Sequence, residues 1–272
     1  MPRPPPRAII VAAMASEPIR VSVSDGVAVL TLDNPPLNLV TLGLTRGLGA
    51  TLGRLAGDAD VRALVVTGAG TRAFCAGSDI HEFGAVADDV VGKKLAAENA
   101  AFAALAAFPR PTIAALNGLA FGGGLELAVC CDLIIAAADV RVGLPEVKLG
   151  VFPGSGGTIR VPRRIGEARA KELMFTGEPI SAETAQAWGL VNRVVPTGQA
   201  LTAARTLAVS LAALPGRALT LMKRAVAIGL EHPEAEAERR TLALSAEVFR
   251  TDDSREGARA FLAKEPARFR HT

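Results

Sequence analysis

Two glutamates, Glu126 and Glu146, occur where ordinary surface acids are not expected. Glu126 follows the glycines 122–124 among Leu, Ala, Val and Cys residues, and Glu146 follows Gly-Leu-Pro after the apolar run 133–138. Poorly hydrated carboxyl groups have raised pKa values, and two of them can act as a general acid and a general base. The pair therefore indicates chemistry in which protons are exchanged.

Each glutamate also has a purely structural interpretation. A carboxylate in the first turn of a helix interacts favourably with the helix dipole, and one that follows a proline usually lies on a solvated loop. Taken singly, these structural interpretations are favoured. The two acids lie between the glycine clusters 122–124 and 154–157 in an otherwise apolar stretch, and this context reverses the preference.

A second segment, residues 67–80, leaves an apolar run, turns on glycines and enters a helix near Asp79. Such a turn exposes backbone N–H groups, and we expect those around Gly77 and Ser78 to converge with those of 122–124, as a developing oxyanion requires. The glycine spacing matches neither the dinucleotide-binding fingerprint nor the phosphate-binding loop that ends in Gly-Lys-Ser/Thr. The sequence also lacks a Gly-x-Ser-x-Gly motif, which disfavours a serine hydrolase.

The composition excludes several other classes of function. The 272 residues include 30 basic and 27 acidic side chains, interspersed, with no tyrosine and one tryptophan, which argues against a nucleic-acid partner. Basic doublets such as Lys93-Lys94 are expected on solvated helix faces. The three cysteines and three histidines lack the spacing of a zinc site or a disulfide framework. We therefore expect no metal, buried thiols and a cytoplasmic location.

Two apolar segments, one near the N-terminus and one over 112–131, partly resemble targeting or membrane-spanning segments. Residues 1–16 contain a proline run and are expected to be a disordered extension, with Met14 as an alternative start; a short apolar run after two arginines resembles a weak secretory signal. The window 112–131 is about as long as a membrane span, but Asn117, Glu126 and its glycines favour a buried strand, turn and helix. We expect no membrane association.

The elements that must position the glutamates alternate between strands and helices, which predicts an α/β fold. The β-like runs are 19–23, 27–32, 62–67, 112–116, 133–138 and 190–195. The first two, joined through Asp-Gly, predict a hairpin, and the later apolar runs are typical of a buried parallel sheet. Strand signals stop near residue 199, so we expect a core domain over 17–198 and a helical region over 199–272.

Three segments resemble a known family. FCAGSDI (74–80), NGLAFGGGLELAVCCDL (117–133) and LPEVKLGVFPGSGGT (144–158) resemble the crotonase, or enoyl-CoA hydratase/isomerase, superfamily, and the similarity extends from about Ile19 to Phe269. The resemblance implies a crotonase-like spiral of ββα units. It also implies a C-terminal helical region that packs between the subunits of a homotrimer or a dimer of trimers.

The resemblance further implies a role for individual residues. The N–H groups of Ser78 and Gly123 would hold the thioester oxygen of an acyl-CoA substrate. Glu126 would activate a water with help from the Gly154 backbone, and Glu146 would exchange the proton at the α-carbon. No cofactor is implied, because coenzyme A is part of the substrate. The expected contacts with coenzyme A are Leu37, Ala76, Gly77, Asp79, Ile80 and, from a neighbouring subunit, Phe261 and Lys264.

Some of these assignments have alternatives. Phe261 and Lys264 are equally compatible with a helix-packing residue and a solvated charge. Ser78 stands where Ala is frequent in the superfamily, and the basic residue that often precedes the Leu37-Asn38 pair is missing. His81 or Arg20 can take its place in binding the phosphates of coenzyme A. The acyl pocket is expected in the Ala-rich region 82–107, which does not indicate a chain length.

Retention of both glutamates favours an enoyl-CoA hydratase, which adds water across the 2,3 double bond of an enoyl-CoA to give a 3-hydroxyacyl-CoA. Many other activities in the superfamily lack one or both acids. An enoyl-CoA isomerase with the same oxyanion hole is the nearest alternative. A non-catalytic, oligomeric binding protein on the same scaffold is a third interpretation, and the intact pair argues against it.

Overall fold

The hairpin predicted from Asp25-Gly26 is the first element of the structure. The structure is a computed structural model, and it describes residues 18–271. Strands β1 (Ile19–Ser24) and β2 (Val27–Leu32) are antiparallel, and the two turn residues have φ angles of 55° and 74°. Such positive angles are needed in a two-residue hairpin turn, and Asp-Gly tolerates them. The extension predicted over 1–16 and the alternative start lie outside the described residues.

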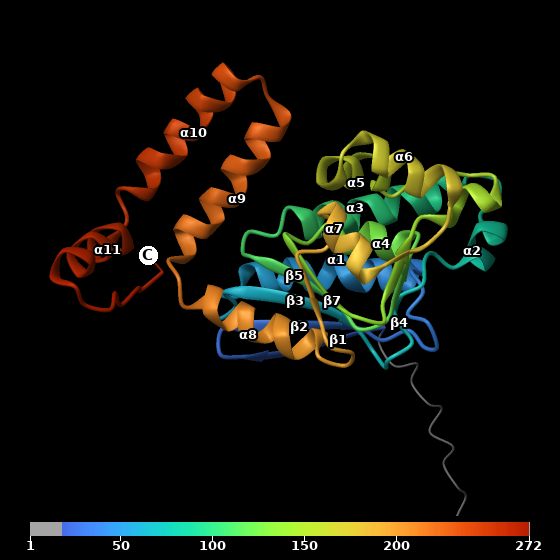
Figure 1. Cartoon of the computed structure of the whole chain (residues 1–272), viewed down its shortest axis with the longest axis horizontal. Helices are drawn as coiled ribbons and strands as arrows, with labels where there is room; N and C mark the ends of the chain where they lie inside the picture. The colour runs from blue at the N-terminus through green and yellow to red at the C-terminus, as the bar shows by residue number, and fades with distance from the viewer. Residues whose placement is uncertain (1–17, 272) are drawn as a thin grey trace, which may run out of the picture.

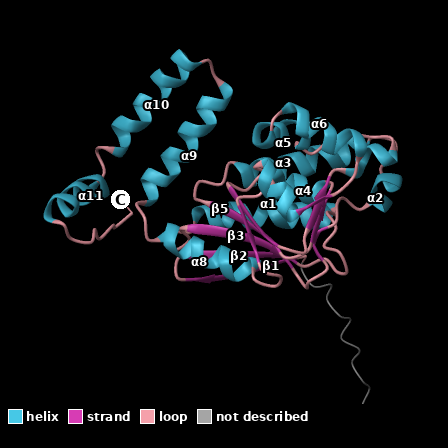
Figure 2. Ribbon diagram, in the orientation of Figure 1, coloured by secondary structure: helices cyan, strands magenta, loops and turns pink. Residues whose placement is uncertain are grey.

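Two sheets form the core of the fold (Figure 2). The large sheet has the order β1-β2-β3-β5-β7-β10 and is parallel from β2 onward, and the small sheet has the order β4-β6-β8-β9, in which only β8 and β9 are antiparallel. The remaining strands are β3 (Ala63–Gly68), β4 (Ala73–Cys75), β5 (Thr112–Leu116), β6 (Leu119–Phe121), β7 (Leu133–Ala137), β8 (Arg141–Gly143), β9 (Ile180–Ser181) and β10 (Arg193–Val195). The β-like runs predicted from the sequence are the strands of the large sheet, which confirms that prediction.

Successive turns of the chain place one strand in the large sheet and the next in the small sheet. Thus β3 leads to β4, β5 to β6 and β7 to β8, and each pair is followed by a short helix: α2 (Ile80–Ala85), α4 (Gly123–Ala128) or the 3-10 helix η2 (Pro145–Leu149). This path is the crotonase-like spiral of ββα units that was expected. Because β4, β6 and β8 are parallel, their carboxyl ends meet at one edge of the small sheet.

Helices cover both sides of the large sheet. Helix α8 packs against β3, β5 and β7, whereas Figure 1 shows α3, α5 and α6 on the opposite side. The other helices are α1 (Leu42–Gly57), the π-helix η1 (Val91–Leu95), α3 (Ala96–Ala106), α5 (Gly157–Ile165), α6 (Glu167–Thr176), α7 (Ala182–Trp188), α8 (Ala200–Ala212), α9 (Gly216–Glu231), α10 (Glu234–Val248) and α11 (Asp252–Ala263). Within residues 18–271, no helix has the length and apolar character needed to cross a membrane.

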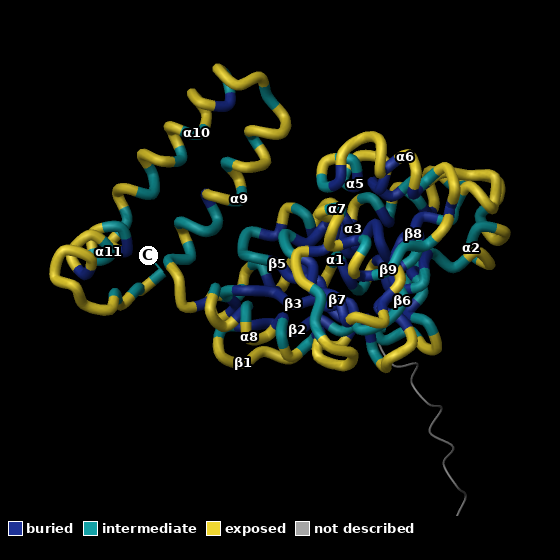
Figure 3. The backbone as a smooth tube through the Cα atoms, in the orientation of Figure 1, coloured by how far each residue is buried: buried dark blue, intermediate teal, exposed yellow. Residues whose placement is uncertain are grey.

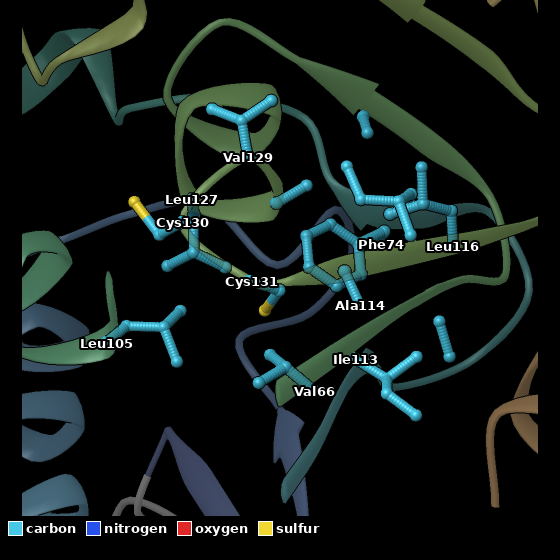
Figure 4. Packing of buried hydrophobic residues seen from close by; sticks show 14 of the residues in the cluster. Val66, Phe74, Leu105, Ile113, Ala114, Leu116, Leu127, Val129, Cys130 and Cys131 are labelled. Carbon is cyan, nitrogen blue, oxygen red and sulfur yellow. The ribbon is translucent and has the colours of Figure 1, made fainter. Parts of the chain in front are cut away.

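The hydrophobic core lies between the sheets and these helices (Figure 3). All residues of β3 and β5 are buried, as expected for strands covered on both faces. Figure 4 shows Cys130 and Cys131 among the apolar side chains of this core. Burial raises the pKa of the Cys75 and Cys130 thiols to about 12, so both stay protonated at neutral pH. The prediction of buried, unpaired cysteines is confirmed.

Helices α9, α10 and α11 form an arm that projects away from the two sheets (Figure 1). Two side-chain contacts attach the first half of α9 to the core: Thr220 Oγ1 donates to the Pro109 carbonyl oxygen (2.7 Å), and Lys223 Nζ lies 2.9 Å from Asp132 Oδ2. The exposed apolar side chains of the arm are Met222, Val226, Leu230, Leu242, Phe249, Phe261 and Leu262. Since α8 lies on the large sheet, the arm begins after Pro215. All elements described after residue 199 are helices, and the domain boundary at 199 stays a prediction.

The expectation that basic doublets lie on solvated faces is wrong for three residues. Lys94 is fully buried, Arg164 donates to the carbonyl oxygen of Cys131, and Lys223 pairs with the half-buried Asp132. Each of these side chains has an acceptor that comes from a different part of the chain. The local sequence pattern does not show such acceptors.

Candidate active site

Backbone hydrogen bonds hold the turn that follows β4, and they leave one N–H group of the turn without an acceptor. The Val40 N–H donates to the Gly77 carbonyl oxygen (2.9 Å), and the Asp79 N–H donates to the Val40 carbonyl oxygen (3.0 Å). The intervening Ser78 N–H donates to no acceptor in residues 18–271. This donor is therefore free to bind a ligand oxygen.

Gly123, the first residue of α4, places a second N–H beside that of Ser78. A Cβ atom on Gly123 would lie 3.4 Å from the Ser78 nitrogen and 2.8 Å from the Ser78 Oγ. The helix comes this close because the next residue is also glycine: a Cβ on Gly124 would lie 2.0 Å from the Cys75 carbonyl oxygen. First-turn N–H groups have no intrahelical acceptor, so the structure brings together the two predicted oxyanion donors.

Glu126 lies in the same short helix and is buried, with 3% of its surface exposed. Its Oε1 accepts hydrogen bonds from the N–H groups of Ser155 and Gly157, both at 2.8 Å. Burial, helped by the nearby charge of Glu146 and opposed by the two N–H donors, raises the pKa of this carboxyl group to about 7. Both hydrogen bonds reach Oε1, which leaves Oε2 for a water.

Glu146 follows β8 and lies in the first turn of η2. Both of its carboxyl oxygens are buried, and neither has a hydrogen-bond partner in the described part of the chain. Oε1 would lie 3.2 Å from a Cβ atom on Gly122, the residue before the Gly123 donor. Burial raises the pKa of this group to about 7 as well. Near neutral pH, one carboxyl of the pair can therefore hold a proton while the other is ionised.

Gly154, predicted to position the attacking water, lies against the region expected to form the acyl pocket. Its carbonyl oxygen accepts a hydrogen bond from Asn99 Nδ2 (2.9 Å), and a Cβ on Gly154 would lie 3.1 Å from Leu95 Cδ1. Both partners belong to the η1–α3 segment, residues 91–106. The role of Gly154 toward water stays a prediction.

Most residues predicted to contact coenzyme A lie together at this turn. The Leu37 carbonyl oxygen accepts the Ala76 N–H (3.0 Å), Asp79 caps α2, and Ile80 is exposed beside it. The two basic groups named as substitutes are already paired: His81 Nδ1 lies 2.9 Å from Asp79 Oδ1, and Arg20 forms an ion pair with Asp33. The side chains of His81 and Arg20 are 90% and 64% exposed, so both stay open to solvent.

Phe261 and Lys264 are not brought to this turn within one chain. Phe261 is 83% exposed on α11, and Lys264 ends that helix. Figure 1 shows α11 at the far end of the arm, on the opposite side of the molecule from α2. A contact with coenzyme A bound to a neighbouring subunit stays a prediction.

Reasoning from the sequence missed three functional candidates, Glu98, Lys94 and the hydroxyl of Ser155. Glu98 is fully buried, and its Oε2 accepts hydrogen bonds from the hydroxyls of Ser155 (2.8 Å) and Ser78 (3.1 Å). Its Oε1 lies 3.1 Å from the ammonium nitrogen of Lys94. The Lys-x-x-x-Glu spacing in helix η1–α3 was the one available signal, but such pairs are usually solvated.

The donor set of the site consists of carboxyl groups, hydroxyls and backbone amides. Within residues 18–271, no group of three or more His, Cys, Asp or Glu side chains is arranged to hold a metal ion. Two N–H donors beside two carboxyl groups with raised pKa values can stabilise a developing oxyanion and transfer protons next to it.

Comparisons with known proteins agree with this geometry. A probable enoyl-CoA hydratase of Mycobacterium bovis is 38% identical over 95% of this chain and 100% of its own length. A crotonyl-CoA hydratase of Syntrophomonas wolfei is 35% identical over 94% and 99%, respectively. The crystal structure of enoyl-CoA hydratase from Bacillus anthracis superimposes with a TM-score of 0.90 at 34% identity, covering 94% of this chain and 100% of that one. The family model described as enoyl-CoA hydratase/isomerase matches residues 22–272, and the chain belongs to this family.

Proposed function

We propose that this chain is an enoyl-CoA hydratase that converts a 2,3-enoyl-CoA into a 3-hydroxyacyl-CoA. The observation that carries the proposal is the pair of buried carboxyl groups, Glu126 and Glu146, beside the free N–H groups of Ser78 and Gly123. Membership of the family supports a coenzyme A thioester as the substrate. The relatives named hydratases support the addition of water.

In the proposed reaction the thioester oxygen binds the N–H groups of Ser78 and Gly123. The ionised Glu126 takes a proton from a water on its free Oε2, and the resulting hydroxide attacks the β-carbon. The electron pair of the double bond moves toward the thioester oxygen, where the two N–H donors stabilise the developing negative charge. The protonated Glu146 then gives its proton to the α-carbon, which completes the addition.

The proton balance explains why both carboxyl groups need a raised pKa. Glu126 starts ionised and ends protonated, whereas Glu146 starts protonated and ends ionised. A carboxyl group with a pKa near 7 can do either at neutral pH at little free-energy cost. The addition of water involves no net oxidation or reduction, so we propose that the reaction uses no cofactor besides the coenzyme A of the substrate.

The test is a spectrophotometric assay with crotonyl-CoA and identification of the product. We expect the absorbance of the conjugated enoyl thioester to fall as 3-hydroxybutyryl-CoA forms. Substitution of Glu146→Gln removes the proton donor and should abolish the reaction, whereas the exposed control Glu183→Gln on α7 should not. Full activity in a Glu126→Ala, Glu146→Ala double variant would contradict the two-carboxyl mechanism.

The same assay separates a hydratase from an isomerase. An isomerase would move the double bond of a 3-enoyl-CoA and incorporate no oxygen from the solvent. We therefore expect heavy oxygen from labelled water in the product, and a product that keeps its double bond and gains no label would favour isomerisation instead.

We also propose that the chain assembles as a homotrimer or a dimer of trimers. The arm exposes apolar side chains such as Leu242 (67%) and Phe249 (75%), while its side-chain hydrogen bonds to its own core in the described residues come from the first half of α9 and from His271. Exposed apolar surfaces of this kind mark protein interfaces. Light scattering should give three or six times the 28.0-kDa chain mass, and a monomeric mass would contradict this assignment.

The proposed location is the cytoplasm. Three buried cysteines without disulfides are typical of a reducing compartment. Cell fractionation with an antibody against the protein tests this proposal, and recovery outside the cytoplasmic fraction would contradict it.

A further inference from the structure

Lys94 and Glu98 form a fully buried ion pair beneath the candidate active site. They lie one turn apart on the η1–α3 segment, and both side chains are 0% exposed. The Lys94 ammonium also lies 2.8 Å from Glu82 Oε2 and 3.2 Å from the Val40 carbonyl oxygen. Buried charges destabilise a fold unless their remaining hydrogen-bonding positions are satisfied, so this lysine is firmly held.

The other oxygen of Glu98 joins two parts of the site that come from different turns of the spiral. Glu98 Oε2 accepts the Ser78 hydroxyl at 3.1 Å and the Ser155 hydroxyl at 2.8 Å. Among the described residues, Glu98 is the hydrogen-bond acceptor for both hydroxyls. The backbone N–H of Ser78 is an oxyanion donor, and the backbone N–H of Ser155 binds Glu126 Oε1. One carboxylate is therefore linked to both halves of the reaction.

We propose that Glu98, anchored by Lys94, is a positioning residue that fixes the oxyanion hole relative to Glu126 through the hydroxyls of Ser78 and Ser155. The inference rests on the proposed hydratase function. Water held by Glu126 must reach the β-carbon while the thioester oxygen stays between its two N–H donors. The rate therefore depends on the distance between Glu126 and the oxyanion hole. A misplacement of about 1 Å can lower a rate by about 100-fold.

The burial of Glu98 limits it to this indirect role. Its side chain has no exposed surface, and its oxygens face Lys94 on one side and the two serines on the other. A group without access to substrate cannot exchange protons with it. Besides its charge, which raises the pKa of Glu126, Glu98 therefore acts on the reaction through the positions of the two serines.

A double-mutant cycle on the two serines tests the proposal. Ser78→Ala and Ser155→Ala each remove one hydroxyl and keep the backbone N–H groups that the reaction uses. Because either change breaks the link, we expect each to lower kcat by about 10-fold and the double variant to lose little more. The KM should stay within about 2-fold throughout. Ser210→Ala, an exposed hydroxyl bound to the Thr206 carbonyl oxygen, is the matched control.

The isosteric Glu98→Gln variant gives a second measurement. It keeps an oxygen acceptor but removes the negative charge, and charged acceptors bind hydroxyls more strongly. We expect a fall in kcat of at least about 10-fold without a change in KM. Melting curves of every variant establish that it is folded, and the two conservative serine changes decide the question if the glutamine variant does not fold.

The outcomes separate the two proposals. A wild-type chain that does not hydrate any enoyl-CoA would overturn both the function and the positioning role. An active wild-type chain whose serine variants multiply their losses, leave kcat unchanged, or raise KM instead would overturn only the role of Glu98. Non-additive losses confined to kcat would support it.

Discussion

Replacing Glu146 with glutamine is expected to stabilise the folded protein in alkaline solution while it abolishes activity. Burial raises the pKa of this carboxyl from 4.5 to about 7, and no described donor reaches either oxygen. One pKa unit corresponds to about 1.4 kcal/mol, so ionisation destabilises the fold by at most about 3.5 kcal/mol. Because solvent reduces this value, we expect glutamine to add roughly 1–3 kcal/mol to the free energy of unfolding at pH 8.

The sign of the effect follows from the direction of the shift. The pKa of Glu146 is higher in the folded chain, so between pH 4.5 and pH 7 the folded chain binds more protons than the unfolded chain. The stability contributed by this group is therefore complete below about pH 4.5 and is lost as the pH rises through 7. Glutamine does not titrate. The gain should be small at pH 5 and complete at pH 8.

Thermal unfolding at pH 5 and pH 8 measures this difference. At equal protomer concentration, the Glu146→Gln chain should melt roughly 2–8 °C above the wild type at pH 8 and close to it at pH 5. The exposed Glu183→Gln control should match the wild type at both values. A lower melting temperature at pH 8, or the same gain at both pH values, would refute the reasoning. Glu126 titrates in the same range, and because the charge of Glu146 raises its pKa, the substitution lowers that pKa and adds to the gain at pH 8.

Four further changes test the packing of the core and the arm. Gly124→Ala should destabilise the fold by at least about 3 kcal/mol in urea unfolding, because its Cβ would lie 2.0 Å from the Cys75 carbonyl oxygen. Gly53→Ala, with open space around it on α1, should stabilise by up to about 1 kcal/mol, and equal effects would contradict this account. Lys223→Met removes the ion pair between α9 and Asp132 and should make the arm more sensitive to limited proteolysis; an unchanged cleavage pattern would count against this attachment. Phe249→Glu should lower the mass of the assembly in ultracentrifugation, and an unchanged mass would place the interface elsewhere.

The large sheet was predictable because most of its strands are runs of apolar residues bounded by turn signals, and β1 alternates apolar and polar residues before the Asp-Gly turn. The C-terminal helices were predictable for a similar reason: proline and N-capping residues mark their starts, as Thr251 does for α11. The small sheet was not predictable. Its strands are two or three residues long, too short to show a period, and they pair only because the spiral places them side by side.

The site residues were likewise predictable only where the local sequence itself carries the signal. Glu126 and Glu146 could be singled out because glycines and apolar residues surround them in the sequence itself. Glu98 stands among Ala-Ala-Glu-Asn-Ala, an ordinary helical sequence, and its burial depends on serines from two distant turns. Lys94 was assigned to a solvated face for the same reason, because a buried ion pair is a property of tertiary packing.

The order of the elements also has a consequence for how the protein is made. The carboxyl groups and N–H donors of the site lie between residues 78 and 157, and the helix that covers the large sheet ends at Ala212. Chains fold as they leave the ribosome, starting from the N-terminal part. The catalytic half therefore emerges first, and the exposed apolar residues of the arm emerge last. The exposed apolar surface of the arm is thus made only after every carboxyl group and N–H donor of the candidate site has been made.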